Sequence, residues 1–131
     1  MRGAAAERFV AVNVRLMAAG FALVGLLFVA VPGFFVDGTD DRLWLALAFA
    51  YMVVITGLAL VVQADVVRYR PLLLVLAAGK AASSLGSIAY YAFEEDSFFL
   101  LLNFVVDGFL AVAALWLWSL AGRVDRAPAP G

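Results

Sequence analysis

LLLVLAAGKAASSLGSIAYYAFEEDSFFLLLNFVVDGFLAVAALWLWSL, residues 72–120, is the stretch that decides the fold. Two long apolar runs, Leu72–Phe93 and Phe98–Leu120, flank the short acidic turn Glu94-Glu95-Asp96. A helix needs about 20 apolar residues to cross the ~30 Å hydrocarbon core of a bilayer, and both runs are long enough. Neither run alternates with period two, as the strands of a membrane barrel do. The stretch therefore predicts two membrane-spanning helices that are antiparallel neighbours, because the turn between them is short.

Two more apolar runs of spanning length precede this stretch, Phe9–Val31 and Leu43–Val62. Pro32-Gly33 follows the first of them, and Pro71 stands at a position that favours the start of the next helix. Short connections place consecutive helices side by side. The sequence thus predicts an all-α, integral membrane, four-helix up-down-up-down bundle. It forms a single transmembrane domain over residues 1–131, with residues 121–131 as a flexible cytoplasmic tail.

The composition excludes several classes of function. Hydrophobic residues make up 66% of the chain, against roughly 45–50% in a soluble domain. Only 15% of the residues are charged, and there is neither cysteine nor histidine. Disulfides, thiolate or imidazole metal ligands and Ser-His-Asp catalysis are therefore excluded. The net charge of −1 and the absence of a basic tract argue against nucleic acid as a partner. We predict no metal, catalytic residue or obligatory cofactor, and a non-enzymatic function is favoured.

Arginine is distributed unevenly between the two predicted sides of the membrane. Cytoplasmic loops of membrane proteins carry an excess of Lys and Arg. On the predicted opposite side, Arg42 stands alone beside Asp37, Asp40, Asp41 and the acidic turn. This asymmetry predicts cytoplasmic termini in a multi-pass protein of the bacterial inner (plasma) membrane. The arginines of the side that carries the termini are Arg2, Arg8, Arg68, Arg70, Arg123 and Arg126.

Two ionisable residues lie deep within the apolar runs. Lys80 follows Leu72 by eight residues, which places it about 12 Å into the membrane at 1.5 Å per helical residue. Asp107 follows Phe98 by nine residues, about 13–14 Å in from the opposite side. Because the two helices are antiparallel, both residues reach the middle of the layer. A Lys80–Asp107 ion pair is therefore predicted, since either charge alone would be costly there.

Further polar residues continue this pair along the same helix faces. From Lys80, polar side chains recur at i+4, i+7 and i+11, which is one face of a helix. Asn103 lies one turn before Asp107 and is expected level with Ser84. The alternative is purely structural: a buried ion pair and small polar residues also determine which helix faces meet. The predicted ligand-binding or polar cluster comprises Lys80, Ser84, Ser87, Tyr91, Asn103 and Asp107.

A second cluster is predicted nearer the cytoplasmic side. Arg15 lies only six residues past Phe9, so its long side chain can reach the headgroups. Asp65, at the end of the second run, is its expected partner, and Asn13 is expected to share the cluster.

Arg15 stands early in the first run, Gly25-Leu26-Leu27-Phe28 leads to Pro32, and Gly57-Leu58 lies in the second run. In these features the chain resembles the DoxX-like group of small bacterial membrane proteins. The resemblance implies a compact four-helix bundle, in a group whose relatives include a subunit linked to quinone-dependent thiosulfate oxidation and sterol-binding proteins.

Three functions follow as hypotheses. The first is an accessory or assembly subunit of a larger membrane complex, with other membrane proteins or a second copy as partners in the bilayer. The second is a binder of a small lipophilic ligand, such as a quinone, a sterol-like lipid or a pigment, in the bundle core. The third is an oligomeric proton- or ion-coupled channel or transporter that uses Lys80 and Asp107. An isomerase that uses Asp107 as acid and base would rest on a single carboxylate.

Overall fold

The computed structural model describes residues 3–35, 42–94 and 96–125, and these form a bundle of four long helices. Each long helix is long and apolar enough to cross a membrane. The predicted all-α class and its four apolar helices are therefore confirmed, and they indicate a multi-pass membrane protein. The elements are α1 (Gly3–Ala30), the short 3-10 turn η1 (Pro32–Phe34), α2 (Arg42–Ala64), α3 (Pro71–Phe93) and α4 (Phe98–Asp125).

The helices cover the predicted runs except for Val31, and two of them extend well beyond. Helix α1 begins at Gly3 instead of Phe9. Helix α4 continues to Asp125, so residues 121–125 are helical and the flexible tail predicted from residue 121 is wrong there. The physical reason is tertiary packing, because Leu120 and Ala121 are buried in the core and stabilise the last turns. Some charged residues used for the predicted orientation lie outside the described residues: Arg2, Asp37, Asp40, Asp41, Glu95 and Arg126.

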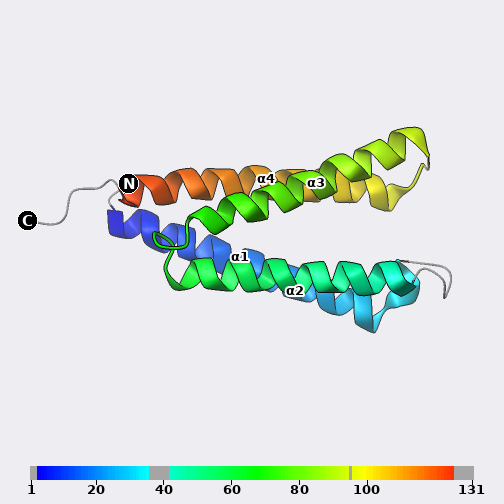
Figure 1. The fold of residues 1–131 in the computed structure, drawn as a ribbon, viewed down its shortest axis with the longest axis horizontal. Helices are drawn as coiled ribbons and strands as arrows, with labels where there is room; N and C mark the ends of the chain where they lie inside the picture. The colour runs from blue at the N-terminus through cyan, green and yellow to red at the C-terminus, as the bar shows by residue number, and fades with distance from the viewer. Residues whose placement is uncertain (1–2, 36–41, 95, 126–131) are drawn as a thin grey trace, which may run out of the picture.

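The helices pack as two hairpins, α1 with α2 and α3 with α4. Contacts within each hairpin are far more extensive than those between α1 and α4 or between α2 and α3. Figure 1 shows the hairpins close together at the end that carries the start of α1 and the end of α4, and diverging toward the other end. The bundle is therefore built from two halves that are each more tightly packed than the contact between them.

The loop between α2 and α3 is fastened to α4 at the close end of the bundle. The Nε of Arg70 donates a hydrogen bond to the carbonyl oxygen of Trp118 at 3.0 Å. The same guanidinium lies 4.4 Å from the centroid of the Trp118 ring, a cation–π contact. A Cβ at residue 122 would lie 2.5 Å from a guanidinium nitrogen, so Gly122 leaves the room that this contact needs. Arg70 thus fixes the α2–α3 loop to the last turns of α4.

Apolar side chains cover both the interior and most of the exterior of the bundle. The core is formed by small and branched residues such as Val14, Ala59 and Ala114, which are fully buried. Large apolar side chains such as Leu85 and Phe109 remain 65% and 72% exposed. Water would disfavour such a surface, whereas the acyl chains of a bilayer match it. The polar groups that remain inside are concentrated in the middle of the bundle.

Candidate functional site

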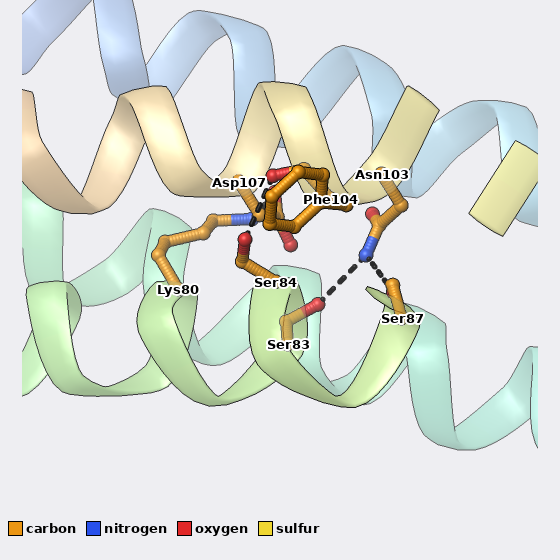
Figure 2. A network of polar contacts seen from close by, with 7 residues as sticks. All are labelled: Lys80, Ser83, Ser84, Ser87, Asn103, Phe104 and Asp107. Atoms are coloured by element: carbon orange, nitrogen blue, oxygen red, sulfur yellow. Dashed lines mark hydrogen bonds and ion pairs between the residues drawn. The ribbon is translucent and has the colours of Figure 1, made fainter. Parts of the chain in front are cut away.

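Lys80 of α3 and Asp107 of α4 form an ion pair in the middle of the bundle. The Nζ of Lys80 donates to Oδ1 of Asp107 at 3.0 Å, and the two residues are only 3% and 4% exposed. Figure 2 shows the ammonium group pointing along α3 toward the carboxylate. The ion pair predicted from depth is therefore present. Its placement follows from helix geometry, since both residues lie nine positions after the first residue of their helix.

Helices α1 and α2 complete the surroundings of the ammonium group with aromatic rings. The Nζ of Lys80 lies 4.8 Å from the centroid of Phe21 on α1 and 5.3 Å from that of Tyr51 on α2. Aromatic faces attract cations, and this attraction strengthens when water is absent. The cation is thus held by one carboxylate and two rings, with all four long helices contributing one group each.

A seam of hydrogen bonds extends the site along α3 and α4. The Nδ2 of Asn103 donates to Ser83 Oγ at 3.0 Å and to Ser87 Oγ at 2.7 Å. Ser84 Oγ donates to the carbonyl oxygen of Phe104 at 2.7 Å. Figure 2 shows these contacts following one another between the two helices. Asn103, which was expected level with Ser84, donates to Ser83 and Ser87, and the hydroxyl of Ser84 donates to the backbone of α4.

A cavity of about 800 Å³ lies beside the ion pair. Its polar lining comes from Asn13, Tyr51, Ser83 and Asn103, together with Lys80 and Asp107, and the rest of its wall is apolar. Pockets for small ligands have this size and this pattern, an apolar wall with a few placed polar groups. The remaining lining residues are Leu16, Met17, Gly20, Phe21, Val24, Phe28, Ala48, Met52, Val106, Phe109, Leu110, Val112, Ala113, Trp116 and Leu117.

The cavity opens between α1 and α4 onto the apolar outer surface. Its lining includes Leu16, Phe109 and Val112, which are among the most exposed apolar side chains of these two helices. At the close end of the bundle, the rings of Phe9 and Trp116 meet edge to face at 5.5 Å. At the opposite end, Phe34 of η1 and the following residue, Phe35, contact Phe99 near the start of α4. That aromatic cluster consists of Phe28, Phe34, Phe35, Phe98 and Phe99.

Several predicted site residues lie outside the cavity. Ser84 and Ser87 are buried, and both form hydrogen bonds between α3 and α4. Tyr91 is not among the lining residues, and its hydroxyl interacts with Asp96 beyond the end of α3. The predicted polar cluster therefore divides into a cavity-facing part and a helix-pairing part.

The second predicted cluster is not brought together. The Nε of Arg15 donates to Gln63 Oε1 at 3.0 Å, and Asp65 Oδ1 accepts the backbone N–H of Arg68 at 3.0 Å. Asn13 bonds the carbonyl oxygen of Phe9 and lines the cavity. The reason is local: Asp65 lies one residue beyond α2 and caps the following turn, whereas Gln63 is still on the helix. Among the described residues, no ion pair joins Arg15 to Asp65.

Sequence reasoning missed Phe21, Tyr51 and Ser83 as members of the site. Ser83 accepts a hydrogen bond from Asn103 and lines the cavity. The Tyr51 hydroxyl is buried without a hydrogen-bond partner among the described residues. Its position near the middle of an apolar run is a signal that could have been used, because buried Tyr hydroxyls normally find partners. Phe21 had no such signal, since nothing distinguishes it from other apolar residues.

Comparisons with known proteins find no matching family model, no matching curated protein and no matching solved structure. The resemblance to the DoxX-like group stays a prediction.

Proposed function

We propose that this protein binds a small lipophilic molecule in the cavity between α1 and α4. The observation that carries the proposal is the cavity itself, about 800 Å³ with an apolar wall and six polar or ionisable residues in its lining. An apolar ligand body would fill the wall region, and the polar residues would orient one end of the ligand. A quinone, a sterol-like lipid or a pigment has this amphipathic form.

The opening gives such a ligand a route of entry. The exposed edges of α1 and α4 face the acyl chains when the four helices span a bilayer. A lipophilic molecule dissolved in the membrane would enter sideways and would not pass through water. This route suits ligands that partition into the bilayer, and it needs no opening at either helix end.

The test is a cavity-filling substitution with a matched control. Gly20 lines the cavity, and a Cβ at residue 20 meets nothing within 4 Å, so Gly20→Leu is chosen to add a side chain at the cavity wall. A Cβ at residue 86 also meets nothing within 4 Å, but Gly86 does not line the cavity. The tagged proteins are extracted from their own membranes in mild detergent and analysed by native mass spectrometry.

We expect a small molecule to accompany the wild type and Gly86→Leu in a 1:1 ratio and to be lost from Gly20→Leu. Equal occupancy in all three proteins, or no bound molecule in any of them, would refute the proposal. A reproducible additional polypeptide would instead favour the accessory or assembly subunit. That function and the ion-coupled channel or transporter stay predictions, because no feature of the described residues is specific to either.

We also propose an up-down-up-down arrangement with cytoplasmic termini in the bacterial inner membrane. The distribution of arginine supports it: Arg8, Arg68, Arg70 and Arg123 lie near the same end of the bundle, and Arg42 begins α2 at the other. Fusions of a periplasm-dependent phosphatase and of a cytoplasm-dependent fluorescent protein to each loop test it. Phosphatase activity from a fusion after residue 69 would contradict the orientation.

A further inference from the structure

We infer that the ligand is an uncharged lipid with a hydrogen-bond-accepting oxygen, such as a ketone, and that it is neither a fatty acid nor a phospholipid. This inference rests on the proposed function and names the chemical class that the same cavity would select. It is drawn from the charges, the depth and the hydrogen bonds of the lining residues.

The charges of the lining cancel. Among the described lining residues, Lys80 and Asp107 are the two that carry opposite formal charges, and they are paired at 3.0 Å. A carboxylate or phosphate on the ligand would compete with Asp107 for the ammonium group and leave one anion unpaired. An ammonium on the ligand would compete with Lys80 in the same way. An uncharged ligand leaves the pair intact, and burying an unpaired charge is costly.

The depth of the polar residues also favours an uncharged ligand over a phospholipid. Lys80 lies nine residues into α3, about 13 Å along the helix at 1.5 Å per residue. The polar end of the ligand would therefore lie near the middle of a ~30 Å hydrocarbon layer. Phospholipid headgroups remain at the interface and do not reach this depth. A molecule that is lipophilic apart from one or two oxygen atoms can reach the middle of the layer.

The hydrogen bonds of the lining leave a donor available. Ser83 Oγ accepts a hydrogen bond from Asn103 Nδ2, and its own O–H donates to no group of the described residues, so it is left to donate. Lys80 has three N–H groups, of which one is directed to Asp107. Both residues line the cavity. A ligand oxygen that accepts a hydrogen bond from Ser83 would lie in the same cavity as the ammonium group of Lys80.

Four probes with the same chain of twelve carbons test this inference: 2-dodecanone, dodecane, dodecanoate and dodecylamine. Each is added at equal concentration to the purified protein in lipid nanodiscs, and 1:1 adducts are counted by native mass spectrometry. The wild type is compared with Gly20→Leu, with Ser83→Ala and with Ser84→Ala. Ser84 is the control because its hydroxyl bonds the backbone of α4 and does not line the cavity.

We expect the wild type to bind 2-dodecanone at least about tenfold more than either charged probe. Ser83→Ala should lower this binding about fivefold, the effect of one lost hydrogen bond of about 1 kcal/mol, and Ser84→Ala should leave it unchanged. Dodecanoate, dodecylamine or dodecane bound as well as the ketone would overturn the inference and leave the proposed function standing. If no probe distinguishes the wild type from Gly20→Leu, the proposed function itself fails.

Discussion

Lys80 and Asp107 compensate each other's formal charge in the buried middle of the bundle. Both are almost fully buried, and the two rings beside the ammonium add attraction without supplying a second counter-ion. Pairs of this kind are poor evidence of net stability, since their desolvation offsets much of their attraction. Removal of one partner alone is strongly destabilising, because it leaves an uncompensated charge in an apolar interior.

The first prediction concerns this pair. Asp107→Leu should lower the free energy of unfolding by about 3 kcal/mol, because Lys80 would lose its counter-ion while remaining buried. The double variant Lys80→Leu with Asp107→Leu should recover much of this loss. Reversible unfolding in mixtures of sodium dodecyl sulfate and mild detergent measures both values. Equal destabilisation of the single and double variants would show that the two side chains do not act as partners.

At the scale of the helices, α3 and α4 depend on small and polar residues for their close approach. Rising residue numbers on α3 meet falling numbers on α4, from Lys80 with Asp107 to Ser87 with Asn103. Ser84 reaches the α4 backbone because Gly108 has no side chain in the way: a Cβ there would lie 3.0 Å from Ser84 Oγ. Hydrogen bonds between membrane helices average only about 0.6 kcal/mol each. The seam therefore depends on close packing at least as much as on its polar contacts.

The second prediction follows from that packing. Gly108→Leu should destabilise the protein by about 2 kcal/mol, because the new side chain displaces Ser84 and separates the helices. Gly86→Leu is the control on the facing helix, where a Cβ meets nothing within 4 Å. The same unfolding measurement compares them. A loss of stability of the same size in both variants would mean that close approach at Gly108 is unimportant.

For the whole molecule, the arrangement of the two hairpins creates the cavity. The α1–α2 hairpin meets the α3–α4 hairpin through Phe9 and Trp116 at one end and through the aromatic cluster at the other. Between these ends, helices α1 and α4 leave room for about 800 Å³. The cavity thus depends on how two separately packed units sit together.

The third prediction tests this arrangement by cross-linking. The chain has no cysteine, so introduced pairs are the only thiols. Phe9→Cys with Trp116→Cys, and Phe34→Cys with Phe99→Cys, should react with a short bismaleimide, because these rings lie 5.5 Å and 5.4 Å apart. The mismatched pair Phe9→Cys with Phe99→Cys should not react within one molecule. A shift in gel mobility reports the cross-link, and efficient reaction of the mismatched pair would contradict the arrangement.

The class of the protein and its principal ion pair could be read from the sequence alone. Apolar runs of spanning length determine four membrane helices, because the bilayer sets the length that each must have. The depths of Lys80 and Asp107 follow from the constant rise of the helix and the short turn between their runs. These are local properties, and no tertiary information is needed to compute them.

The tertiary structure alone decided which residues of α1 and α2 join the site. Phe21 and Tyr51 reach the ammonium group, and Arg15 pairs with Gln63 instead of Asp65, because of how each helix is rotated and where it ends. The buried face of α4 likewise extends the helix to Asp125. The cavity depends on the angle between the hairpins, which side-chain packing sets and periodicity does not encode. Sequence determined the helices and their charges, and packing between hairpins determined the space that a ligand could occupy.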